Sequence, residues 1–233
     1  MLDPMSYLGS KAASGAYQAI IAQMPPHDTY IETHLGTGVV MQRKPPALRS
    51  IGIDRNADVL RQFACDYRVE LFEDDCIEWL NQFNLYNAGR VLIYADPPYL
   101  IETRTSQKRY KCDYTVNDHK RLLNLLLGIP AMVMISSYPC GLYEAWLRGW
   151  SRFEFQTMTR GGVRTEVIWM NFPSCGSHWA SFAGVNFTDR QRIKRKATRW
   201  AANYRALPSG ERTAILAALL EVHSDRASAT RKP

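Results

Sequence analysis

Short apolar runs alternate with amphipathic segments along the first 170 residues, and this alternation limits the chain to few folds. The apolar runs predict strands at 29–33, 50–53, 69–72, 91–95, 131–136, 153–157 and 165–172. The segments between them predict helices near 11–23, 56–66, 76–83, 117–127 and 140–148. Strands that alternate with helices form βαβ units, so we expect an α/β fold with a mainly parallel sheet.

The last two predicted strands have too short a connection for a parallel crossover. Only the segment from Met158 to Arg164 separates them, and it contains Gly161-Gly162. A connection of this length favours an antiparallel hairpin at the edge of the sheet. The sequence therefore predicts a Rossmann-like sheet, mainly parallel, with one late antiparallel strand.

Charge is distributed unevenly along the 233 residues. Residues 173–233 contain 11 Lys and Arg against 4 Asp and Glu, so the whole net charge of +7 lies in this tail. A neutral body with a basic appendage indicates a polyanionic partner such as nucleic acid, although a merely solubilising tail is the alternative.

The tail also changes in composition after a small-residue linker at 173–186. Thr188 to Gln191 has the spacing of a capping box, and an amphipathic helix is predicted after it. Leu207 to Gly210 should end that helix, and a second, apolar helix is predicted from about Glu211 to Val222. We expect a basic helical hairpin at 187–223, packed on the body or on a second copy, and a disordered end at 224–233.

Hydrophobic segments and cysteine content bear on the cellular compartment of the protein. We recognise neither a secretory signal nor an apolar stretch suited to cross a membrane. The five cysteines are an odd number without a C-x-x-C pair, so we expect reduced thiols, a cytoplasmic location and no metal site.

The segment Asp96-Pro97-Pro98-Tyr99 directly follows the apolar run 91–95. A proline cannot donate a ladder hydrogen bond, so the strand should stop here. A carboxylate, a rigid turn and an aromatic ring are thus presented together at the carboxyl end of a strand, where open α/β sheets bind their ligands.

Two further segments predict a nucleoside-binding site. Leu35-Gly36-Thr37-Gly38 follows the first strand, and its glycines allow close approach of a ligand. The second strand ends in Asp54, which is placed to accept hydrogen bonds from ribose hydroxyls, and the third ends near Asp74-Asp75. A helix N-cap is the alternative role for each acid. Because both phosphate-loop and G-x-G-x-x-G motifs are missing, an adenosine cofactor bound without a phosphate loop is favoured.

The order of these motifs resembles the Dam-like family of DNA N6-adenine methyltransferases, which carry the D-P-P-Y motif. The resemblance spans about residues 5–172 and includes Tyr7 to Lys11 and the late strand Arg164 to Asn171. It implies S-adenosylmethionine as cofactor, with cofactor contacts from Tyr7, Lys11, Asp54 and Asp96. The motifs above add Leu35, Gly36, Gly38 and Asp75 as predicted cofactor contacts, and Asp74 stays open as the alternative to Asp75. It also implies catalysis by Asp96 and the Pro97 carbonyl, with Tyr99 stacking on a base flipped from duplex DNA.

One departure from the family concerns sequence recognition. The family places a recognition segment between the third and fourth strands, where this chain has only the residues from Cys76 to Arg90. The predicted nucleic-acid contacts are therefore Arg104, Lys108, Arg109, Tyr110 and Lys111 in the loop, and Arg192, Arg195 and Arg199 in the tail.

The expected function is site-specific methylation of adenine N6 in double-stranded DNA, with a homodimer through the tail as a further expectation. Two alternatives stay open. In the first alternative, the enzyme methylates adenine in RNA or the N4 amino group of cytosine. In the second, the chain is a nucleic-acid-binding protein on an inactive methyltransferase fold.

Overall fold

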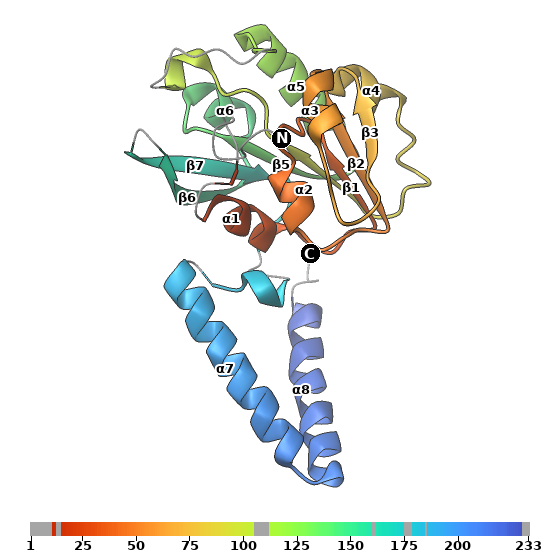
Figure 1. Cartoon of the computed structure of the whole chain (residues 1–233), viewed down its shortest axis with the longest axis vertical. Helices are drawn as coiled ribbons and strands as arrows, with labels where there is room; N and C mark the ends of the chain where they lie inside the picture. Colours follow the sequence, from red (N-terminus) through yellow and green to blue (C-terminus); the bar gives the residue numbers. More distant parts are fainter. Residues whose placement is uncertain are drawn as a thin grey trace. The chain divides into compact units, whose positions relative to one another are not determined.

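The structure is a computed structural model, and it describes residues 11–12, 15–104, 112–159, 162–174, 179–184 and 186–229 (Figure 1). The chain divides into two compact units, Met1–Ala183 and Gly184–Pro233.

The first unit contains a seven-stranded sheet in the order β3-β2-β1-β4-β5-β7-β6. Its strands are β1 Thr29–Glu32, β2 Arg49–Asp54, β3 Glu70–Glu73, β4 Val91–Ala95, β5 Met132–Ser137, β6 Ser151–Thr159 and β7 Gly162–Met170. All pairs from β3 across to β5 are parallel, and β7 runs antiparallel to both of its neighbours. The predicted Rossmann-like α/β fold with one late reversed strand and an edge hairpin is confirmed.

Helices cover both faces of this sheet, because the buried strands present apolar side chains alternately to each side. The helices are α1 Ala16–Gln23, α2 Val39–Arg43, α3 Ala57–Gln62, α4 Cys76–Gln82, α5 Val116–Gly128 and α6 Gly141–Trp146, with short 3-10 turns η1 Ile101–Thr103 and η2 Ala180–Phe182. One core lies between the sheet and α4, α5 and α6, and a second lies between the sheet and α1 and α2. The strand order reverses between β1 and β4, which opens a crevice at their carboxyl ends.

The second unit consists of two long helices, α7 Phe187–Ala206 and α8 Ser209–Ala229, joined at Leu207 and Pro208 (Figure 1). The predicted hairpin is present, with two corrections. Asn186, whose side chain accepts from the Asp189 amide, caps α7 in place of Thr188. Helix α8 continues to Ala229, beyond the predicted end of the hairpin at 223, and residues 224–229 include neither proline nor glycine to stop a helix. Residues 230–233 lie outside the described residues.

None of the helices in the described ranges combines the length and the apolar character that a membrane span requires.

Candidate active site

The glycine loop after β1 has a backbone that only glycine adopts easily. Gly36 and Gly38 have φ angles of 52° and 65°, in the left-handed region. A Cβ atom at Gly38 would lie 2.3 Å from the ring of Phe63, so the space beside this glycine is also filled. The Leu35 amide donates to the Ile53 carbonyl at 2.9 Å, which ties the loop to β2. The loop is therefore a fixed turn along one side of the crevice.

Asp54 lies at the end of β2 and organises this turn. Its carboxylate accepts from the Gly36 amide at 2.9 Å and from the Asn56 amide at 2.8 Å. Burial raises the pKa of the Asp54 carboxyl, and the two amides oppose that rise. Asn56, not Asp54, caps α3. Since each carboxylate oxygen can accept more than one hydrogen bond, Asp54 keeps capacity for a ligand in the crevice.

Asp75 has the alternative role that the sequence leaves open for it, as a helix N-cap. Its side chain caps α4 by accepting from the amides of Ile77 and Glu78, and it forms an ion pair with Arg55. The neighbouring Asp74 lines the crevice instead. Of the two acids that the sequence leaves open as cofactor contacts, Asp74 is thus the one that lines the pocket.

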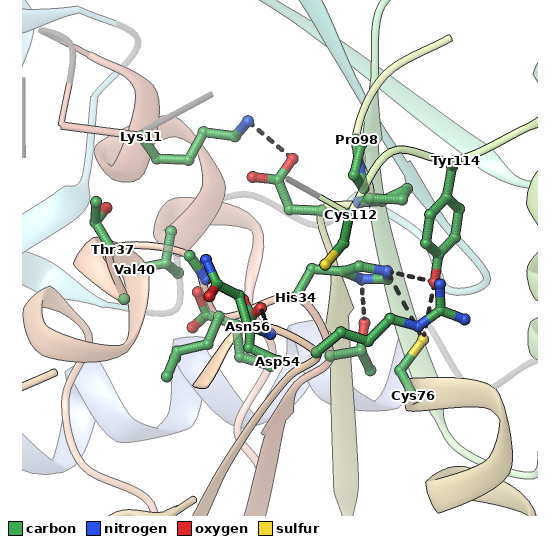
Figure 2. Close-up of a pocket in the computed structure, with 18 of the residues that line it drawn as sticks. Lys11, His34, Thr37, Val40, Asp54, Asn56, Cys76, Pro98, Cys112 and Tyr114 are labelled. Carbon is green, nitrogen blue, oxygen red and sulfur yellow. Dashed lines mark hydrogen bonds and ion pairs between the residues drawn. The ribbon is translucent and has the colours of Figure 1, made fainter. Parts of the chain in front are cut away.

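Asp96 and Tyr99 follow β4 and meet Lys11 from the start of the described chain. Lys11 Nζ lies 2.8 Å from Asp96 Oδ1 and donates to the Tyr99 hydroxyl at 2.8 Å. Tyr99 in turn donates to Glu166 Oε2 at 2.8 Å, and its ring packs edge-on against Tyr138. Figure 2 shows the Lys11 ammonium directed at the carboxylate across the crevice. Two of the predicted catalytic residues are thus fixed in one polar cluster.

The ionisable groups in this cluster are buried, and both burial and their neighbours shift their pKa values. Burial raises the pKa of Asp96 to about 6, against the stabilising effect of Lys11 on the carboxylate. Burial on its own lowers the pKa of Lys11, but the Asp96 and Glu166 carboxylates outweigh it and hold that pKa well above its usual value. Lys11 is therefore a cation, and Asp96 changes its charge close to neutral pH.

Glu32 is a site residue that sequence reasoning missed. It ends β1, lines the same crevice, and accepts from the Tyr30 hydroxyl at 3.0 Å. Burial raises its pKa to about 8. The sequence did contain a signal for Glu32, because it is an acid at the last position of a short buried strand. Such an acid is rarely fully buried without a function.

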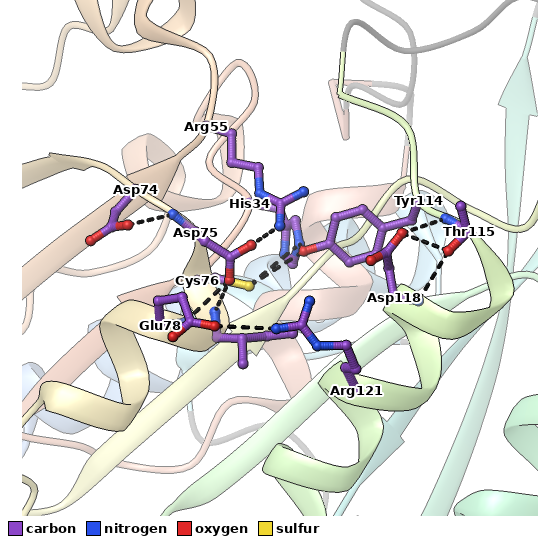
Figure 3. Close-up of polar contacts among 11 residues, drawn as sticks. His34, Arg55, Asp74, Asp75, Cys76, Glu78, Tyr114, Thr115, Asp118 and Arg121 are labelled. Carbon is purple, nitrogen blue, oxygen red and sulfur yellow. Dashed lines mark hydrogen bonds and ion pairs between the residues drawn. The ribbon is translucent and has the colours of Figure 1, made fainter.

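Polar contacts between the loop after β1, the start of α4 and the segment before α5 form another wall (Figure 3). His34 Nε2 lies 2.9 Å from the Tyr114 hydroxyl, and the Cys76 thiol lies 3.5 Å from the same hydroxyl. Burial lowers the pKa of His34 to about 3, so this histidine is neutral. The wall is therefore an uncharged hydrogen-bonded surface, with the Arg55–Asp75 ion pair at its edge.

These walls line one pocket, which has a cavity volume of about 90 Å³. The predicted site residues that line it are Lys11, Leu35, Gly36, Gly38, Asp54, Asp96, Pro97 and Tyr99. Among the described residues, no group of three or more His, Cys, Asp or Glu side chains is arranged to hold a metal ion.

Arg104, predicted to contact nucleic acid, is instead engaged within the protein. Its guanidinium pairs with both carboxylate oxygens of Asp113 and donates to the Tyr99 carbonyl, with its side chain only 8% exposed. A guanidinium held in this way braces the turn after β4, so we withdraw Arg104 from the predicted nucleic-acid surface. Outside the described residues lie the predicted contacts Tyr7, Lys108, Arg109, Tyr110 and Lys111.

The predicted tail residues Arg192, Arg195 and Arg199 are exposed on α7. Arg192 pairs with Asp189 one turn earlier at 2.7 Å. These residues belong to the second unit.

Comparison with known proteins gives a distant likeness only. No protein-family model matches the chain, and no curated protein sequence matches it. Among solved structures, 23S rRNA methyltransferase ErmE is similar at 10% identity over 71% of this chain and 70% of that chain, with a TM-score of 0.44. An rRNA methylase from Streptococcus thermophilus is 12% identical over 66% of this chain and 91% of that one, with a TM-score of 0.40. The N-methyltransferase NodS from Bradyrhizobium japonicum WM9 is 9% identical over 67% and 93%, with a TM-score of 0.43. At these values no substrate is transferred to this chain, and the function is argued from the pocket.

Proposed function

We propose that this chain is an S-adenosylmethionine-dependent methyltransferase that modifies the N6 amino group of adenine in double-stranded DNA. One observation carries the proposal: Asp96 and Tyr99 line the same pocket as the glycine loop and Asp54. A nucleoside-binding turn and an acceptor for an amino group therefore lie in one crevice, at the point where the strand order reverses.

The residues fit the proposed cofactor. Gly36 and Gly38 add no side chains to the turn, Asp54 suits ribose hydroxyls, and Asp74 is the acid available to an adenine amino group. Glu32 adds a buried carboxyl group that its raised pKa of about 8 keeps largely protonated near neutral pH, so it can donate or accept a hydrogen bond to a ligand. When bound, S-adenosylmethionine supplies a methyl group already activated by its positive sulfonium.

The protein's part in the reaction is to hold an amino nitrogen in position. The lone pair of this nitrogen is delocalised into the base, which makes it a weak nucleophile. Asp96 and the Pro97 carbonyl accept its two hydrogens and direct the lone pair towards the methyl donor. Tyr99 stacks on the flipped base, so positioning and electrostatics supply the rate acceleration.

We further propose that the tail holds the substrate or a second copy. Between β3 and β4 the chain has only α4 and a short connection, so recognition has to come from elsewhere. Helix α7 exposes Arg192, Arg195 and Arg199, which suit phosphates. Helix α8 exposes Ile215, Leu216, Leu219 and Leu220 by 38–59%, which suits pairing of two tails in a homodimer. We expect this enzyme to act on DNA in the cytoplasm.

The test is a transfer assay with radiolabelled S-adenosylmethionine and plasmid DNA, RNA or buffer, followed by digestion and chromatography of the bases. Label in N6-methyladenine from DNA supports the proposal. Label only in RNA or in N4-methylcytosine establishes the alternative acceptor. A folded protein that binds DNA and transfers no label to any acceptor is a binding protein on an inactive fold.

A further inference from the structure

Glu166 is a charged residue in the middle of a sheet and has no part in the reaction as proposed so far. It lies on β7, paired in register with Phe155 of β6, and it is only 6% exposed. Burying a carboxylate costs several kcal/mol unless it is paired and hydrogen-bonded. Its place in the structure therefore depends on what it contacts.

Both oxygens of Glu166 are used, and their partners belong to other segments. Oε2 accepts from the Tyr99 hydroxyl at 2.8 Å and lies 3.3 Å from Lys11 Nζ. Oε1 accepts from the Thr157 hydroxyl on β6 at 3.1 Å. The carboxylate thus joins β6, β7, the turn after β4 and the residue that begins the described chain.

This arrangement fixes the direction of each hydrogen bond around Tyr99. The Lys11 ammonium has only donors, so the Tyr99 hydroxyl must accept from it. The same hydroxyl must then give its own hydrogen to Glu166. The phenol is held from two sides, and the plane of the ring is set by the protein before any base arrives.

Glu166 also shares the Lys11 charge with Asp96. The ammonium lies 2.8 Å from Asp96 and 3.3 Å from Glu166, so one cation serves two carboxylates. Without Glu166, Lys11 would be balanced by Asp96 alone and would compete for the oxygens that the target amino group needs. With Glu166, Lys11 keeps a second partner when Asp96 turns to the substrate.

We propose that Glu166 is a positioning residue for methyl transfer, which orients Tyr99 through its hydroxyl and anchors Lys11 beside Asp96. The inference rests on the proposed function, because it assigns Tyr99 and Asp96 their roles at the target base.

The primary test is Glu166→Gln, which keeps the size and removes the charge. We expect kcat to fall on the order of ten- to a hundredfold, the range for loss of a charge-assisted hydrogen bond. The pH profile provides a second readout. Asp96 faces Lys11, Glu166, Tyr99, Tyr94 and Glu32. Loss of the Glu166 charge lowers the Asp96 pKa, so the acid limb of kcat/KM shifts to lower pH.

Two variants separate positioning from mere folding. Glu166→Asp keeps the charge, so we expect partial recovery of kcat with the acid limb at its wild-type position. Glu154→Gln on β6 is the matched control, because this exposed glutamate pairs only with Arg152 among the contacts resolved here, and it should leave kcat and the profile unchanged. A folded Glu166→Gln variant with wild-type kcat and an unshifted acid limb overturns the inference.

A third variant and an activity-free measurement cover the remaining cases. If Glu166→Gln does not fold, Thr157→Val decides: a lower kcat at constant KM supports the inference, and an unchanged kcat overturns it. Titration of the Asp96 carboxyl by carbon NMR, assigned with Asp96→Asn, needs no substrate. If the wild type transfers methyl to no acceptor, the proposed function fails, and this titration alone decides whether Glu166 acts on Asp96.

Discussion

Replacing Asp96 by Asn tests the chemistry most directly, because it keeps the shape of the side chain and removes one acceptor. The asparagine amide presents a donor where the target amino group needs an oxygen. An interaction made only in the transition state is lost, and comparable losses in other enzymes cost about 10²–10³ in kcat, or about 2.7–4 kcal/mol. Lys11 retains Tyr99 at 2.8 Å and Glu166 at 3.3 Å, so the fold should persist.

The same carboxyl predicts a pH dependence. Burial raises the pKa of Asp96 to about 6, and the charged carboxylate is a stronger acceptor of an amino hydrogen than the neutral acid. Below pH 6, wild-type kcat/KM should therefore fall about tenfold per pH unit, and above it the value should level off. For stability the sign is opposite. Because the pKa of Asp96 is higher in the folded than in the unfolded protein, protonation of this group favours the folded state at low pH. That contribution to the free energy of unfolding is lost as the pH rises through 6. Asp96→Asn should thus gain stability relative to the wild type between pH 4 and pH 7.

The assay combines labelled methyl transfer to DNA with chemical unfolding at several pH values. Glu154→Gln, an exposed acid on β6, is the control for loss of a carboxylate. Residual kcat within threefold of the wild type, in a folded Asp96→Asn protein, would refute the assigned role of the carboxylate.

Three further predictions concern other parts of the chain. Asp54→Ala removes the acceptor of two backbone amides, so it should weaken binding of S-adenosylhomocysteine by at least tenfold in calorimetry; unchanged affinity would remove Asp54 from the site. Arg104→Ala removes the ion pair to half-buried Asp113 and the hydrogen bond to the Tyr99 carbonyl, so it should lower stability by about 1–3 kcal/mol in urea unfolding, whereas a loss of DNA affinity alone, without destabilisation, would contradict its bracing role. Deletion of 187–233 should weaken DNA binding in a salt-dependent way or halve the mass in light scattering, and a protein unchanged in both would show the tail to be passive.

Much of the fold follows from local sequence. Strand β4 occupies 91–95 as predicted, and the D-P-P-Y turn ends it because proline cannot continue the ladder. The hairpin of β6 and β7 follows from its short connection. Helix ends were less predictable: α8 runs to Ala229 because a continuing helix needs only the absence of breakers, and composition suggested disorder instead.

The sequence predicted those site residues that lie at the ends of strands. It did not predict the roles that depend on which side chains from other segments lie beside them. Of two adjacent acids, Asp74 faces the pocket and Asp75 caps a helix, and which acid does which depends on where α4 begins relative to Arg55. Arg104 reads as a phosphate contact until Asp113 is seen beside it. A local sequence pattern does not show which side chain from a distant segment will lie beside a given residue.

Sequence alone therefore determined the α/β class, the glycine turn and the position of Asp96 at a strand end, because these follow from periodicity and from residues that stop a strand. Only the tertiary structure decided that Lys11, Asp96, Tyr99 and Glu166 form one buried cluster. The physical reason is distance along the chain: Lys11 and Glu166 are joined through the reversed strand β7, and a contact between such remote segments exists only once the sheet has assembled.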